Sequence, residues 1–116
     1  MGYFAYAAFG REIRRRFSTP LGETKGRGNA VTLKLRRPAR IGHVHIMEDI
    51  AHGERVRSYK IEAHTGASDW TTLAEAQSIG HKRIHRFAPV EVAAVRLTVV
   101  QSTAEPIVRS LAAFAT

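Results

Sequence analysis

Along most of the chain, apolar and polar residues alternate with a period of two. In the last third of the sequence, Val95, Leu97 and Val99 alternate with polar residues. Successive side chains of a β-strand point to opposite faces, so this pattern is typical of a half-buried strand. The same pattern predicts strands over residues 31–35, 41–47, 56–64, 70–74, 79–87, 92–100 and 107–114. Short turns separate these segments, and we therefore predict an all-β fold, an antiparallel β-sandwich.

Prolines and glycines indicate where the strands end. Pro38 and Pro89 each follow a predicted strand, and proline cannot donate a backbone hydrogen bond to a sheet. We therefore expect one strand to end before each of them. Residues 22–29 are rich in glycine, which predicts a loop, and Glu48 begins a second loop that continues through Gly53.

The N-terminal residues have a different period. An apolar stripe with helical spacing predicts a helix over residues 3–17, made of Tyr6, Phe9, Ile13 and Phe17. Pro20 ends it, so we divide the chain into an N-terminal linker helix over 1–20 and a β-sandwich domain over 21–116. So many large apolar residues are not left in water on a monomer. We expect the stripe to cover one edge of the sandwich or to form a homo-oligomer.

Composition limits the classes of function. The 116 residues make one domain, and the absence of cysteine excludes disulfides and thiolate metal sites. The net charge of +8 raises the possibility of an anionic partner, but the arginines are spread over every segment, whereas a nucleic-acid site needs a basic patch on one face. No apolar run approaches the ~20 residues of a membrane span. The apolar start of the chain lacks the preceding basic residues of a signal peptide.

Several short motifs then occur in a recognisable order. They are Met47–Ile50, Gly53–Arg57, Tyr59, Ile61–Ala63, Trp70, Leu73–Ala74, Ser78–Ile84, Arg86–Phe87 and Val95–Leu97. As an ordered set, they resemble the C-terminal domain of α-L-fucosidases. The resemblance implies a galactose-binding-like (discoidin-like) β-sandwich, a jelly roll, that follows a catalytic barrel. The predicted helix over residues 3–17 looks like the linker that leaves such a barrel. If the chain belongs to a secreted fucosidase, it is extracytoplasmic.

The sequence contains no recognisable catalytic machinery of its own. A glycosidase generally uses two carboxyl groups about 5–9.5 Å apart, whereas Glu48 and Asp49 are neighbours whose side chains diverge on an extended chain. A (β/α)₈ barrel also needs about 200 residues or more. His43 and His45 share one strand face, but a metal site needs further ligands, which His64, His81 or His85 could supply only if the fold happened to bring one of them close. We therefore expect no catalytic residue, no metal and no other cofactor.

A small set of residues remains as candidates for contacting carbohydrate. A tryptophan ring can stack on a sugar, and charged or polar side chains can bond its hydroxyls. The candidates are Glu48, Arg55, Trp70, His81, Lys82 and Arg83. Each has a structural alternative. Trp70 can belong to the core, and Glu48 and Asp49 can form ion pairs with Arg55, Arg57 or Lys82 that fix the 48–53 loop.

Three functions follow in order of preference. The first is a non-catalytic accessory domain that binds carbohydrate or supports a catalytic barrel, so that its partner is a glycan or the fucosidase catalytic domain. The second is a structural or protein-interaction domain that binds no sugar. The third, which the dispersed charge disfavours, is a basic nucleic-acid-binding domain.

Overall fold

The structure is a computed structural model that describes residues 20–66 and 69–115. In these residues the elements are β1 (Gly22–Arg27), β2 (Ala30–Glu48), the 3₁₀ turn η1 (Ile50–His52), β3 (Val56–His64), β4 (Trp70–Ala76), β5 (Arg83–Ser102) and β6 (Ile107–Ala115). All pairings are antiparallel, in the order β1-β6-β2-β5-β3-β4. The predicted all-β antiparallel fold is confirmed. The helix predicted over residues 3–17 lies outside the described residues.

The strands β2 and β5 run through the two prolines that we expected to end them. That prediction was wrong, because each proline lies where the β2–β5 pairing is interrupted. Between the pairs Lys34↔Ala94 and Ala39↔Val92, residues 35–38 of β2 face a single residue of β5. Between Ile41↔Val90 and His43↔Arg86, residues 87–89 of β5 face only Gly42. A bulge already lacks ladder hydrogen bonds, so proline costs little there and the strand bends instead of ending.

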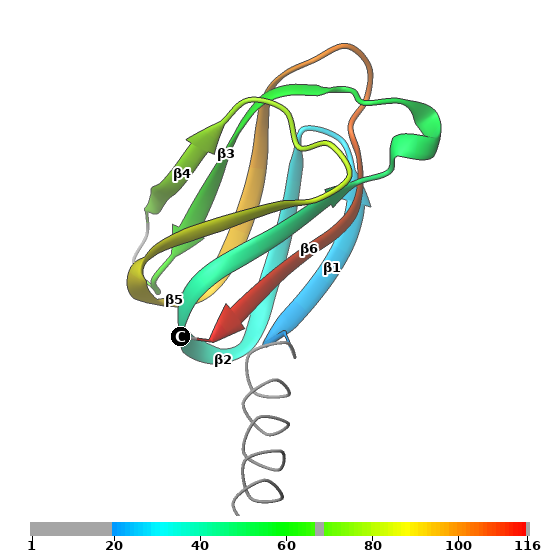
Figure 1. Ribbon diagram of the computed structural model, residues 1–116. Coiled ribbons are helices and arrows are strands. Elements are labelled where there is room, and N and C mark those ends of the chain that lie inside the picture. Colours follow the sequence, from blue (N-terminus) through cyan, green and yellow to red (C-terminus); the bar gives the residue numbers. More distant parts are fainter. Residues whose placement is uncertain (1–19, 67–68, 116) are drawn as a thin grey trace, which may run out of the picture.

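These bends fold the sheet into two layers (Figure 1). The first half of β2 and the second half of β5 lie beside β3 and β4, in what we call the β3 layer. The second half of β2 and the first half of β5 lie beside β6 and β1, in what we call the β6 layer. Strands that cross from one layer to the other through bulges form the corners of such packings.

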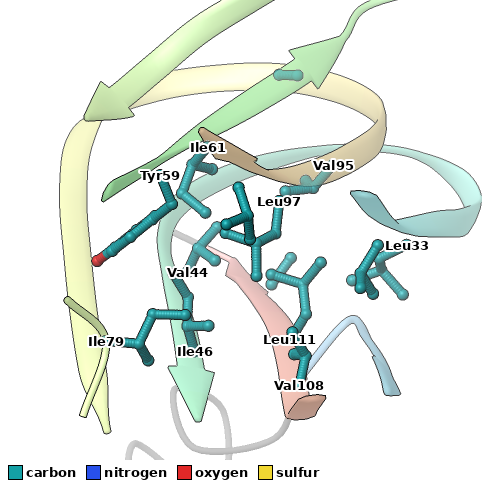
Figure 2. Packing of buried hydrophobic residues seen from close by; sticks show 14 of the residues in the cluster. Leu33, Val44, Ile46, Tyr59, Ile61, Ile79, Val95, Leu97, Val108 and Leu111 are labelled. Carbon is teal, nitrogen blue, oxygen red and sulfur yellow. The ribbon is translucent and has the colours of Figure 1, made fainter. Parts of the chain in front are cut away.

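The hydrophobic core fills the space between the layers (Figure 2). The β3 layer contributes Ile61 and Leu97, and the β6 layer contributes Val44, Ile46 and Leu111, all of them fully buried. These are the inward positions of the alternating pattern, so the predicted inner faces of strands 41–47, 56–64 and 92–100 are confirmed.

The expected loop over residues 22–29 is instead largely strand β1, paired with β6. Its glycines face the core where the layers approach closely. A Cβ added at Gly22 would lie 3.1 Å from Leu35 Cδ2, and one added at Gly26 would lie 3.3 Å from Val31 Cγ2. Glycine is therefore used here for close packing and not for a turn, a distinction that composition does not reveal.

Candidate binding surfaces

Three loops meet at the end of the sheet that carries η1 (Figure 1). The backbone N–H of Glu48 donates to the carbonyl of Gly80 (3.4 Å), and that of Thr103 donates to the carbonyl of Arg55 (2.9 Å). The structure thus brings Glu48 and Arg55 to the same end as the loop that precedes β5. That loop carries His81 and Lys82, and Arg83 begins β5.

The carboxylate of Glu48 is buried and faces the backbone. Only 1% of the residue is exposed, and its Oε2 accepts hydrogen bonds from the N–H groups of Arg55 (2.6 Å) and Val56 (3.0 Å). The prediction that Glu48 forms an ion pair with Arg55, Arg57 or Lys82 was wrong, because its carboxylate accepts hydrogen bonds from these two backbone N–H groups instead. Glu48 does hold the loop that follows it. A residue this buried offers no surface to a sugar.

The other candidates at this end are exposed or partly exposed. The guanidinium of Arg55 donates to the carbonyl of Glu105 (3.0 Å), and that of Arg83 donates to the carbonyls of Gln77 (3.3 Å) and Ser78 (3.2 Å). Arg55 therefore connects two loops, and Arg83 fixes the loop that leads into β5. His81 and Lys82 are exposed. Sugar contact by these four residues stays a prediction.

Trp70 lies apart from this cluster, at the start of β4, and is half-buried. It pairs with His64, which lies on the outer side of β3 because Ile61 and Ala63 face the core. The guanidinium carbon of Arg96 lies 4.2 Å from the centroid of the Trp70 ring, a cation–π geometry. The His64 ring meets the indole edge-on at 5.2 Å between centroids. Trp70 is thus part of the outer surface of the β3 layer and not of the core.

Sequence reasoning did not single out Glu62, the acidic residue at the centre of this surface. Glu62 is 5% exposed, and its carboxylate lies 3.0 Å from Arg96 Nε and 3.7 Å from Lys60 Nζ. It also accepts a hydrogen bond from the hydroxyl of Thr98. The hydrogen bond from Arg96 is the main cause of the lowered pKa of Glu62. We call this group the Trp70 surface, formed by Lys60, Glu62, His64, Trp70, Arg96 and Thr98.

The outer side of the β6 layer carries a second group. His43 pairs with Phe114 on one side and Arg86 on the other, and His45 pairs in the same way with Ala112 and Ile84. Leu21 precedes Gly22, the partner of Ala113, and therefore lies beside Phe114. We call this group the histidine face, formed by Leu21, His43, His45, Ile84, Ala112 and Phe114.

Ring contacts hold the centre of the histidine face together. The His43 ring stacks on Phe114 with 4.9 Å between centroids and 5° between planes, and the His45 ring lies 4.2 Å from the same phenyl ring. Only 6% of Phe114 is exposed. Burial lowers the pKa of both histidines, that of His45 to about 4, and the nearby charges of Lys82 and Arg86 add to this. Both imidazoles are therefore neutral at pH 7.

The described residues show no sign of metal chemistry. Within residues 20–66 and 69–115, no group of three or more His, Cys, Asp or Glu side chains could hold a metal ion. The same two stretches contain no helix that is long and apolar enough to cross a membrane.

Comparisons with known proteins place this fold. The family model of the NedA-like, galactose-binding domain matches residues 16–97. No curated protein shows a significant match. Among solved structures, an α-L-fucosidase from Bacteroides thetaiotaomicron shares 42% identity over 92% of this chain, with a TM-score of 0.84. A glycoside hydrolase 29 family member from a rumen bacterium shares 28% over 93%, with a TM-score of 0.74.

The fold recurs at lower identity in a family 29 fucosidase from Ruminococcus gnavus, at 21% identity over 94% of this chain and a TM-score of 0.76. The chain spans only 25%, 21% and 29% of these three proteins. Its structural neighbours are the C-terminal regions of α-L-fucosidases. The chain itself belongs to the family of NedA-like, galactose-binding domains.

Proposed function

We propose that this chain is a non-catalytic accessory domain that works beside the catalytic domain of an α-L-fucosidase. The observation that carries the proposal is the match of 42% identity over 92% of this chain to one quarter of a Bacteroides α-L-fucosidase. A domain that accounts for so small a share of the enzyme leaves the hydrolytic chemistry to the remainder. Consistent with this, the acidic side chains singled out by the sequence, Glu48 and Asp49, serve the local backbone: Glu48 accepts from two amides, and Asp49 caps η1 through Ala51 N–H.

We place the carbohydrate contact of this domain on the Trp70 surface. Arg96 and His64 fix the orientation of a half-buried indole, and an aromatic ring held in this way can stack on the C–H side of a sugar ring. Lys60 and Arg96 supply hydrogen-bond donors beside it, and the buried Glu62 holds both cations in place. The exposed His81 and Lys82 at the opposite end form the alternative contact, with Arg55 and Arg83 next to them.

A binding experiment separates these two positions. The full chain is titrated with a panel of fucosylated and galactose-containing oligosaccharides, followed by NMR or calorimetry. We expect Trp70→Ala to weaken binding about tenfold, which corresponds to ~1.4 kcal/mol. The double variant His81→Ala, Lys82→Met is the matched control and should bind as the parent does. Loss of binding in the double variant alone would move the site to the loop end.

A second function is favoured by a different observation. The histidine face is aromatic and uncharged at its centre, which suits contact with another protein better than contact with a sugar. If no oligosaccharide of the panel binds, the domain acts by protein contact alone. In either case the isolated chain should not hydrolyse an aryl α-fucoside.

A further inference from the structure

The histidine face has the composition of an interface centre and not of an ordinary outer sheet surface. Its two largest aliphatic side chains, Leu21 and Ile84, are 43% and 42% exposed, and they flank the buried ring of Phe114 and the two imidazoles. Protein interfaces combine an apolar, aromatic centre that is depleted in charge with a polar rim. On this face the charges lie at the margins, with Arg86 beside His43, Lys82 near His45 and Glu23 beside Ala112.

The face also stays uncharged under neutral conditions. The neutral histidines add aromatic area without requiring the removal of a full charge from water when a partner covers them. Glu23 accepts a hydrogen bond from the hydroxyl of Ser110, which holds its carboxylate at the edge of the face. Covering the centre of this face therefore costs little desolvation free energy.

The outer side of the β3 layer does not have this character. There Glu62 forms ion pairs with Lys60 and Arg96, and the large exposed aliphatic residue of that layer, Val100, is not flanked by a second one. A partner that covered the Trp70 surface would have to remove paired charges from water, for which good geometry only roughly compensates. Of the two outer sides, the β6 layer is the better suited to a protein partner.

The point at which the chain joins the sheet bears on which partner covers the histidine face. The N–H of Leu21 donates to the carbonyl of Ala113 at 2.8 Å, so the backbone enters the described region at the edge of the histidine face. In the solved α-L-fucosidases the matching region is C-terminal and makes up about a quarter of the chain. In a protein with that organisation, the chain that comes from the preceding domain joins the sheet at this edge.

From these observations we infer that the histidine face docks the catalytic domain of an α-L-fucosidase; this inference rests on the proposed function. The partner surface is apolar opposite Leu21, Ile84 and Phe114. It carries carboxylates opposite Arg86, where charge complementarity fixes the orientation of the two domains.

The test uses a chimera in which the full chain replaces the C-terminal region of the Bacteroides thetaiotaomicron α-L-fucosidase. The variants Leu21→Glu and Ile84→Glu place a charge on the face at positions that are exposed in the isolated domain. The matched controls are Val100→Glu and Ile50→Glu, at 67% and 46% exposure away from the face. All four variants should leave the thermal midpoint of the isolated chain close to that of the parent, which excludes misfolding as the cause of an effect.

We expect the parent chimera to unfold in one calorimetric transition and to resist proteolysis between its domains. Leu21→Glu and Ile84→Glu should split the transition into two and raise the rate of interdomain cleavage about tenfold, equivalent to a loss of ~1.4 kcal/mol of coupling. The two controls should behave as the parent. Loss of coupling in all four variants, or in none, would overturn the assignment of the face while leaving the accessory function standing.

Two further outcomes distinguish other occupants. A parent chimera that unfolds in two independent transitions overturns both the docking and the supporting role of the domain. If the isolated full chain forms a dimer that Ile84→Glu dissociates and Val100→Glu does not, the face joins two copies of this chain and the inference is wrong.

Discussion

The outer surfaces of the two layers are built on the same antiparallel β-sheet but are covered by different kinds of side chain. On the β3 layer, Glu62 is almost buried under two cations and a hydroxyl, and Arg96 in turn lies on the ring of Trp70. On the β6 layer, two neutral imidazoles cover Phe114. The first surface keeps its charges paired and partly in water at its centre, whereas the centre of the second consists of uncharged rings, with the charges of Arg86 and Glu23 at its margins. The outer face of a sheet can thus be covered either by ion pairs or by aromatic rings. Only the face covered by uncharged rings can bind a protein partner without removing paired charges from water.

The sharpest way to break this comparison is to remove the ring on each side. Phe114→Ala should destabilise the domain by about 3 kcal/mol, because a phenyl ring with 6% exposure loses its contacts with two imidazoles and leaves a cavity. Trp70→Ala should cost only about 1 kcal/mol, because the indole is half-buried at the start of an edge strand. Denaturant unfolding of both variants measures the difference. Equal losses would show that the two surfaces are closed in the same way.

Acid should affect the two surfaces in different pH ranges. The pKa of His45 is about 4 in the folded chain and about 6.5 when unfolded, so the unfolded state binds more protons between these values. The stability that the neutral imidazole contributes is therefore present above pH 6.5 and is lost as the pH falls toward 4. Partial exposure reduces the effect to about 1 kcal/mol at pH 5. The lowered pKa of Glu62 acts in the same direction but only below its unfolded value of 4.5.

The measurement is the unfolding free energy at pH 7, 6 and 5, in the parent and in His45→Gln. The variant should lose most of the decline between pH 7 and 5, and Glu62→Gln should not. A decline that survives in His45→Gln would mean that the titration of other groups governs the acid response.

The smallest expected effect is the coupling across the Trp70 surface. In a double-mutant cycle, Glu62→Gln and Arg96→Met should show a coupling energy of about 0.5 kcal/mol, because Arg96 remains partly exposed. The coupling should fall further in 1 M salt, which screens exposed charges. The same cycle on His43→Gln and Phe114→Leu should not respond to salt. Equal salt dependence on both sides would remove the electrostatic half of the comparison.

The sequence predicted what is local and failed where neighbours come from distant segments. A period of two correctly placed Val44, Ile46 and Ile61 inside and the histidines outside. It could not place Glu62 beside Arg96 or His43 beside Phe114, because those contacts depend on the order of strands in the sheet. Residue type alone also misled. Pro38 was expected to end a strand that only bends, since its effect depends on whether its missing N–H had a partner.

The candidate site was only partly predictable, because some of its contacts join residues that are distant in the sequence. Trp70 was selected by residue type, but Arg96 and His64, which orient its ring, come from strands whose pairing the sequence does not specify. Glu48 was correctly assigned to hold its loop. The hydrogen-bond partners of Glu48 were not predicted, because they are backbone N–H groups, which every residue type except proline has.

The bends in β2 and β5 also govern how the domain assembles. The same two strands form part of both layers, and their paired residues are separated by 37 to 68 positions, from Ile46 with Arg83 to Ala30 with Thr98. Neither layer can be completed before this long loop closes, and its closure contributes strands to both layers at once. We therefore expect slow, all-or-none folding. In native-state hydrogen exchange, the central amides of β2 and β5 should open with one common free energy, as a single cooperative unit shared by the charged and the aromatic sides.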